Sequence, residues 1–244
     1  MDMVREFEIL EKAKVFFRER IAAKHLDNTL KLKNIDAFNI NPFTQKYLAQ
    51  FAFGNSDPES MARVILYPRI LGTSISTTFG NELQFFCNEV LSSFASTTSG
   101  IDIEYTDAVD ERRKYCQVKA GPTTINNDDV ATIENHFTAI KNLARTNRLT
   151  DFNPLFDCVV GVLYGDESSL SASYKKIAKN YTVLAGQDFW EHLTGDPLFY
   201  GKLINAFAEV ADEMDSSEII EEVVKKLSEQ IAGQLPHGYE DADR

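Results

Sequence analysis

The stretch that decides the fold is residues 99–121, which read SGIDIEYTDAVDERRKYCQVKAG. Apolar and polar side chains alternate from Ile101 to Tyr105 and again from Tyr115 to Ala120, which is typical of half-buried β-strands. The polar residues 107–114 separate the two runs. The pattern therefore predicts a β-hairpin with a polar loop.

One face of this hairpin carries groups that can do chemistry. Side chains at i and i+2 of a strand share a face, so Asp102 points with Glu104, and Gln117 points with Lys119. If the hairpin closes near residues 109–110, paired residue numbers sum to about 219 to 221, which places Asp102 across from Gln117 or Lys119. A carboxylate, an amide and an ammonium then lie together. The same pattern also describes an ordinary cross-strand ion pair on a solvated face.

Helices are predicted on both sides of the hairpin. Asn41-Pro42 and Asp57-Pro58 are helix start signals, and a longer helix is predicted over residues 78–94. Asn127-Asp128-Asp129 is predicted to cap a helix, and strands are predicted over residues 156–164 and 181–185. Further helices are predicted over residues 188–193, 197–210 and 217–231. The expected fold class is α/β, with a mixed sheet flanked by helices.

We divide the chain into four parts. Residues 1–76 are an N-terminal helical region, and residues 77–186 are the catalytic α/β core. Residues 187–234 are a C-terminal helical region and a candidate for dimerisation, because they carry more apolar surface than a small appendage usually hides. The alternative is that this surface packs on its own domain. Residues 235–244 are a polar tail that we expect to be disordered.

Composition limits the function classes. The net charge is −12, but residues 209–244 alone carry 11 acidic and 3 basic residues, so the rest of the chain is only mildly acidic and can hold a basic cleft. No apolar run reaches the roughly 18 residues of a membrane span, and the N-terminus lacks a secretory signal, so we expect a cytoplasmic protein. The three cysteines and four histidines lack metal-ligand spacing, and we expect the cysteines to be small buried residues.

Asp102, Gln117 and Lys119 resemble the motif of the PD-(D/E)XK nucleases, which have an acid on one strand and an acid or Gln, any residue and Lys on the next. The following residues 120–126 and the capped helix after them look like type II restriction endonucleases. The stretch from Tyr67 to Asp102 is similar to a group of these enzymes that cut interrupted GGNCC-type palindromes. The resemblance covers roughly residues 41–193.

The resemblance implies a restriction-endonuclease-like fold and a Mg²⁺ cofactor bound by Asp102, Gln117, the Val118 carbonyl and a glutamate. Many members have Glu where this chain has Gln117, and an amide is a poorer metal ligand than a carboxylate. Glu82, at the start of the long helix, or Glu104 is expected to supply the missing charge, with Glu89 a weaker candidate. On this basis Gln117→Glu is expected to keep or raise activity.

The implied substrate is double-stranded DNA, cut by a homodimer at a palindromic or interrupted-palindromic site, because two antiparallel strands need two copies of one site. Candidates for DNA contact are polar or basic residues after the hairpin, which could equally form solvated faces: Thr123, Asn126, Lys141, Arg145, Arg148, Lys175 and Lys176. Three alternatives remain open: a DNA repair or recombination nuclease, a catalytically inactive DNA-binding module with the same fold, and a structural α/β protein.

Overall fold

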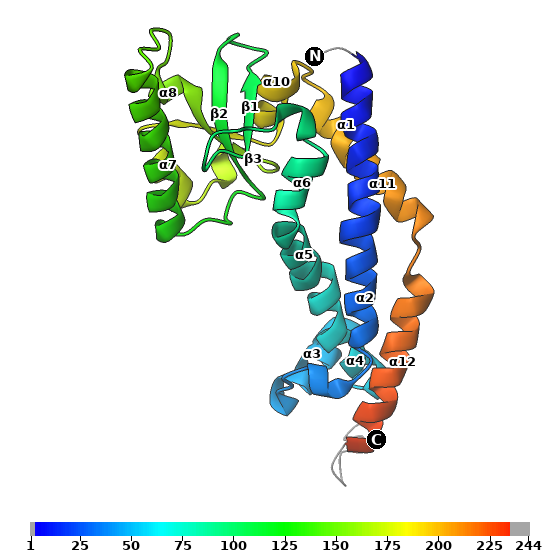
Figure 1. The fold of residues 1–244 in the computed structure, drawn as a ribbon. Coiled ribbons are helices and arrows are strands. Elements are labelled where there is room, and N and C mark those ends of the chain that lie inside the picture. The colour runs from blue at the N-terminus through cyan, green and yellow to red at the C-terminus, as the bar shows by residue number, and fades with distance from the viewer. Residues whose placement is uncertain (1–2, 235–244) are drawn as a thin grey trace. The chain divides into compact units, whose positions relative to one another are not determined.

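The computed structural model describes residues 3–234 (Figure 1). The chain forms two compact units, and each is described by itself. The first comprises Met1–Phe17 and Glu82–Val210, and the second comprises Arg18–Asn81 and Ala211–Arg244, within the described residues. The predicted division into residues 1–76, 77–186 and 187–234 stays a prediction. The predicted polar tail, residues 235–244, lies outside the described residues.

The first unit contains the sheet and the helices that cover it. Its helices are α1 (Met3–Phe16), α6 (Leu83–Glu89), α7 (Asn127–Thr146), α8 (Pro154–Asp157), α9 (Ala172–Ile177), α10 (Gln187–Thr194) and the larger part of α11 (Phe199–Glu213), with short 3-10 turns at Ser92–Phe94 and Glu167–Ser169. Its strands are β1 (Ile103–Thr106), β2 (Arg113–Lys119), β3 (Cys158–Val162) and β4 (Thr182–Ala185). The predicted α/β fold with a mixed sheet and flanking helices is confirmed.

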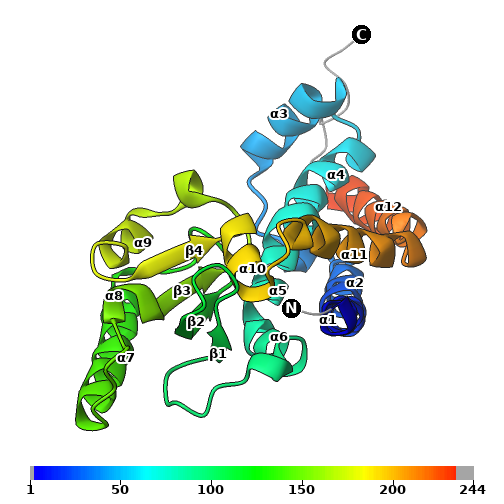
Figure 2. The same cartoon turned by 90° about the horizontal axis from the view of Figure 1, so that it is seen from above.

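The sheet has the order β1-β2-β3-β4. Strands β1 and β2 form the predicted antiparallel hairpin, with Ile103 opposite Cys116, whereas β2, β3 and β4 run parallel. Helices α7 and α9 cover one face, and α10 covers the other, where the Phe189 ring packs on Gly161 (Figure 2). Because both faces are covered, every residue of β3 is buried.

The second unit is helical. It begins at Arg18, the second residue of the π-helical turn Phe17–Ala22. Its other elements are α2 (Ala23–Lys31), the turn Ile35–Ala37, α3 (Pro42–Phe53), α4 (Pro58–Pro68), the π-helical turn Arg69–Ser74, α5 (Ile75–Asn81) and α12 (Ser217–Gln234). Its core includes Met61 and Leu66 of α4 with Val223 and Leu227 of α12. None of the helices in residues 3–234 is long and apolar enough to cross a bilayer.

The predicted helix over residues 78–94 is wrong as a single helix. The chain leaves helical geometry at Glu82, where φ is −91° and ψ is 0°, and so separates α5 from α6. Gly80 and Asn81 have low helix propensity, which favours a break at this point. Strand β1 also begins at Ile103 and not at Ile101, so Asp102 lies just before the strand. The start signals at Asn41 and Asp57 are confirmed by α3 and α4.

Candidate active site

The backbone of β2 fixes the carboxylate of Asp102. The Asp102 amide donates a hydrogen bond of 3.0 Å to the Cys116 carbonyl, continuing the hairpin ladder beyond β1. The Val118 amide donates a bond of 2.8 Å to Asp102 Oδ2. The side chain therefore has one definite position against the next strand, and Oδ1 accepts no hydrogen bond from residues 3–234.

The charge of Asp102 is incompletely compensated. Burial raises its pKa, and this effect outweighs the Val118 amide and the positive charge of Lys119, which lower it. A carboxyl group with a raised pKa gains from an additional positive charge nearby. The Asp102 carboxylate therefore has a reason to bind a cation that the protein itself does not supply.

Lys119 is the last residue of β2 and is half-buried. Its backbone carbonyl accepts a hydrogen bond of 3.0 Å from the Leu163 amide. Its ammonium makes no hydrogen bond or ion pair with another described residue, although its charge acts on Asp102. The ammonium is therefore available for an anionic ligand.

The amide of Gln117 is held on its nitrogen side. Gln117 is 4% exposed, and its Nε2 donates to the Gly100 carbonyl at 2.6 Å and lies 2.6 Å from Nδ1 of His136. The oxygen Oε1 has no hydrogen-bond partner within residues 3–234. This oxygen is therefore the atom of Gln117 that can accept a ligand.

Glu104 has no free carboxylate oxygen. Oε1 accepts hydrogen bonds from Ser96 at 2.5 Å and Thr98 at 2.6 Å, and Oε2 accepts from the guanidinium of Arg113 at 2.5 and 3.1 Å. Burial raises the pKa of Glu104, but these hydrogen bonds outweigh it and the pKa is lowered. The geometry indicates that Glu104 anchors the loop before Asp102 to β1 and β2.

Glu82 is buried at the N-cap position of α6, where its carbonyl accepts a hydrogen bond of 2.9 Å from the Phe86 amide. Glu82 lies in the first unit, as Asp102 does. Within the described residues, no three His, Cys, Asp or Glu side chains are arranged to hold a metal ion. Of the predicted ligand residues, Asp102 and Val118 are in direct contact, through the Val118 amide.

The candidates for DNA contact after β2 have different surroundings. Asn126 caps α7, because its Oδ1 accepts hydrogen bonds from the amides of Asp128 at 2.7 Å and Asp129 at 3.0 Å. Thr123 is exposed in the preceding loop. Lys176 donates to Asn127 at 2.6 Å. Thr123 is thus the freest of these side chains to contact a ligand.

The remaining candidates are exposed basic side chains in two places. One group lies on α7 and just beyond its end, and the other lies on α9: Lys141, Arg145 and Arg148, and Lys175. Arg148 has a positive φ of 56°, so its backbone leaves helical geometry. The structure places both groups in the first unit, which also contains Asp102.

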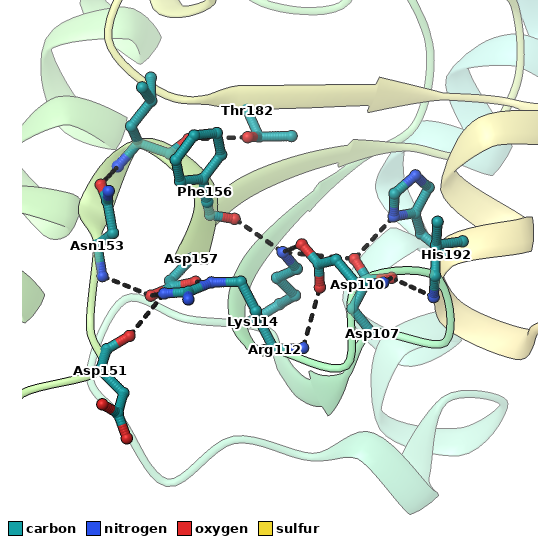
Figure 3. A network of polar contacts seen from close by, with 12 residues as sticks. Asp107, Asp110, Arg112, Lys114, Asp151, Asn153, Phe156, Asp157, Thr182 and His192 are labelled. Atoms are coloured by element: carbon teal, nitrogen blue, oxygen red, sulfur yellow. Dashed lines mark hydrogen bonds and ion pairs between the residues drawn. The ribbon is translucent and has the colours of Figure 1, made fainter.

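The structure also contains a buried polar cluster that the sequence patterns did not single out, at the start of β2 (Figure 3). The Lys114 side chain is 3% exposed and contacts the carboxylates of Asp107 and Asp110 and the Phe156 carbonyl. His192 of α10 binds Asp107 at 2.7 Å. Lys114 has the same parity along the strand as the buried Cys116 and Val118, and this spacing was the sequence signal for its burial.

A second pair extends this cluster toward α8. The guanidinium of Arg112 binds both oxygens of Asp157 at 2.6 Å, and Asp157 also accepts a hydrogen bond of 2.6 Å from the Asn153 amide (Figure 3). Arg112 donates further to the Asp151 carbonyl at 2.6 Å. All these groups have protein partners, so the geometry indicates a structural role for the cluster.

The chain matches a known family. The family model described as Type II restriction endonuclease EcoO109I matches residues 5–215. The match covers the hairpin, the parallel strands and most of the helices of both units. No curated protein matches the chain.

Proposed function

Because the chain belongs to the EcoO109I family of type II restriction endonucleases, we propose that it cuts double-stranded DNA at a specific palindromic or interrupted-palindromic site, with Mg²⁺ as cofactor. The family consists of deoxyribonucleases that bind DNA. The observation that carries the proposal is the Asp102 carboxylate, whose pKa burial raises, beside the unpaired ammonium of Lys119. We assign Asp102, Gln117 and Lys119 to the motif of the PD-(D/E)XK nucleases. We also propose that the protein acts on DNA in the cytoplasm.

The residues present fit a magnesium ion by the chemistry of their donor atoms. Asp102 Oδ1 and Gln117 Oε1 are oxygens without a hydrogen-bond partner in residues 3–234, and the Val118 carbonyl is the third proposed ligand. Mg²⁺ binds oxygen, uses one or two carboxylates and keeps several waters. Glu82 remains the proposed source of a second carboxylate, whereas Glu104 is fully engaged by Ser96, Thr98 and Arg113.

Each side chain has a distinct role in this proposal. A Mg²⁺ ion bound there would neutralise charge on the phosphate and lower the pKa of a bound water. Asp102, held by the Val118 amide, supplies the negative charge that binds the ion. Lys119 donates hydrogen bonds to a phosphate oxygen and orients the attacking water. Gln117 contributes a neutral oxygen ligand.

The surroundings of Gln117 change the expected effect of Gln117→Glu. A carboxylate at this position would face the Gly100 carbonyl across the present 2.6 Å contact, where two acceptors repel. We therefore expect Gln117→Glu to lower activity, in contrast to the expectation from the motif alone. Full activity of Gln117→Glu would show that the side chain turns away from Gly100.

DNA contact is proposed for Thr123, for Lys141, Arg145 and Arg148 around α7, and for Lys175 and Lys176 on α9. Asn126 can contribute only through Nδ2, because its oxygen caps α7. Side chains that bind phosphate add affinity at every sequence, whereas those that contact base edges set the recognition site. Alanine variants assayed on cognate and non-cognate DNA separate these two roles.

A homodimer is proposed because a duplex cut needs two copies of the Asp102 site. The apolar side chains of residues 197–231 are mostly buried, including Phe199, Leu203 and Val223. The exposed apolar side chains gather on α3 instead: Phe43, Tyr47, Leu48 and Phe51 are 91, 64, 43 and 77% exposed. Because an aromatic side chain covers roughly 150–250 Å², pairing two copies of this α3 surface would bury on the order of 1,000 Å², near the lower limit for a specific interface.

Sedimentation without DNA tests the α3 surface. The wild type is expected at about twice 27.5 kDa, the mass of one chain. Phe51→Glu is expected at the mass of a single chain, because charge repulsion and desolvation oppose pairing. Leu198→Glu, at a side chain that is 68% exposed in the turn before α11, is the control and should stay dimeric. A dimeric Phe51→Glu would place the interface elsewhere.

One digest tests the proposed function. Plasmid and phage DNA are incubated with the purified protein, with Mg²⁺ or with EDTA. Discrete fragments that require Mg²⁺ support a site-specific endonuclease. A smear would indicate a nuclease of repair or recombination type, and uncut DNA that is nevertheless bound would indicate an inactive DNA-binding module.

A further inference from the structure

His136 lies between two residues of the proposed site. It is on α7, one residue before the fully buried Phe137, and it is half-buried. Its Nδ1 is 2.6 Å from Nε2 of Gln117. Gly100, two residues before Asp102, packs on the imidazole ring so closely that a Cβ there would lie 2.6 Å from Cγ and Cδ2. The imidazole therefore contacts both the segment that leads into β1 and strand β2.

The hydrogen bonds of Gln117 fix the state of the imidazole. The Gly100 carbonyl can only accept, so the atom of Gln117 that faces it at 2.6 Å must be the amide nitrogen. The same nitrogen faces His136 Nδ1, which must therefore accept, with the proton of the neutral ring on Nε2. Both N–H bonds of the amide are then used, one on Gly100 and one on His136.

This arrangement has a consequence for the oxygen. If the amide turned over, Oε1 would face the Gly100 carbonyl and the nitrogen would take the place of the oxygen. The turned form brings two acceptors together at Gly100, and it keeps its bond to His136 only if the ring moves its proton from Nε2 to Nδ1. The Gly100 carbonyl and the accepting nitrogen of His136 together keep Oε1, which has no hydrogen-bond partner within residues 3–234, as the atom of Gln117 that is offered to a ligand.

We propose that His136 is a positioning residue that orients the Gln117 amide so that its oxygen, and not its nitrogen, is presented for a divalent cation. The proposal rests on the proposed function, since it assigns Gln117 to the metal site. It explains how a neutral amide serves at a position where a carboxylate is the stronger ligand: the amide is fixed in advance, which lowers the cost of binding. Groups that orient a metal ligand typically change metal affinity by about 10- to 100-fold when removed.

Two variants separate the accepting nitrogen from the ring. His136→Phe keeps a flat ring against Gly100 but removes the acceptor, and His136→Asn keeps an acceptor near the position of Nδ1 but removes the ring. Asn135→Ala, at an exposed neighbour on α7, is the control for effects on the helix. Thermal melting of all three shows that the variants are folded before they are compared.

The first measurement needs neither cleavage nor metal. In the metal-free protein, the Gln117 side-chain NH₂ resonances, assigned by their absence in Gln117→Glu, are expected to exchange slowly with water. Because one hydrogen bond corresponds to about a fivefold protection, exchange should be at least about fivefold faster in His136→Phe and nearly unchanged in His136→Asn and Asn135→Ala. Equal exchange in His136→Phe and the wild type would overturn the proposal.

The second measurement is Mn²⁺ affinity by calorimetry, together with DNA cleavage at increasing Mg²⁺. His136→Phe is expected to bind Mn²⁺ about 10- to 100-fold more weakly and to need correspondingly more Mg²⁺, whereas His136→Asn recovers most of the affinity. Equal loss in both variants, or loss in neither, would overturn the proposal. A wild type that cuts no DNA under any condition would instead refute the proposed function, and the exchange measurement would still decide the role of His136.

Discussion

The two ends of β2 each carry a lysine beside an aspartate, Lys114 with Asp107 and Lys119 with Asp102. At the first end, Asp107 accepts from the Val109 amide at 2.8 Å and from His192 at 2.7 Å, and Lys114 also reaches Asp110 and the Phe156 carbonyl. At the second end, Asp102 has one backbone donor, and Lys119 has no hydrogen-bond partner in the described chain.

The pKa values of the two aspartates show the difference. Burial raises the pKa of both, but the hydrogen bonds from His192 and the Val109 amide reverse the effect at Asp107, whose pKa is lowered. At Asp102 the single backbone bond is not enough, and the pKa is raised. Similar Lys–Asp pairs at the two ends of β2 thus have different roles. Where the protein supplies all the partners, the pair stabilises the fold. Where it does not, a ligand is expected.

The largest expected effect is on activity at the Asp102 end. Asp102→Asn should lower the cleavage rate by on the order of 10³-fold, because the charge that binds the cation is lost. The same variant should leave the free energy of unfolding at pH 7 unchanged or slightly higher, since the buried charge costs stability and an amide oxygen can still accept from Val118. Plasmid cleavage rates and urea unfolding measure the two quantities. A strongly destabilised Asp102→Asn would show that this end also holds the fold.

The next effect is on stability at the Lys114 end. Lys114→Met should lower the free energy of unfolding by about 3 kcal/mol, because it leaves the buried Asp107 without its ammonium partner. Lys119→Met is the matched variant five residues along the same strand, and it should lose activity with little change in stability. Urea unfolding of both proteins checks this prediction. Equal destabilisation would remove the distinction between the two ends.

How much of this difference the sequence could predict depends on the range of the interactions. The hairpin register was predictable, since the observed pairs, such as Ile103 with Cys116, follow from local alternation. The burial of Lys114 could have been read from its parity with Cys116 and Val118. The contact of Gln117 with His136 could not, because it depends on how far α7 lies along the sheet, which no local pattern specifies. The predicted cap of α7, Asn127-Asp128-Asp129, lies one residue too late, because Asn126 is the N-cap.

The smallest effect is a pH dependence at the Lys114 end. The hydrogen bond to Asp107 raises the pKa of His192, so its contribution to stability is complete below about 6.5, the unfolded value, and is lost as pH rises through the folded value. The lowered pKa of Asp107 adds stability that is lost only in acid, as pH falls below about 3.8 and through the folded value.

Unfolding of the wild type and His192→Gln between pH 5 and 9 tests this prediction. The wild type should lose on the order of 1 kcal/mol across the titration of His192. His192→Gln keeps a donor without a titrating ring, so its stability should be nearly constant over the same range. A parallel decline in both proteins would assign the titration to another group.

The link between His192 and Asp107 spans 85 residues of sequence, whereas the contacts of Gln117 with Gly100 and His136 lie within residues 100–136. During synthesis, the groups of the site can therefore meet before the chain that carries β3, β4 and α10 has left the ribosome. Until α10 arrives, the carboxylate of Asp107 lacks its imidazole partner. Contacts of long sequence separation form late and slow the folding of a domain. In refolding, the backbone amides of the hairpin loop should consequently become protected from hydrogen exchange later than the amides at the Lys119 end of β2.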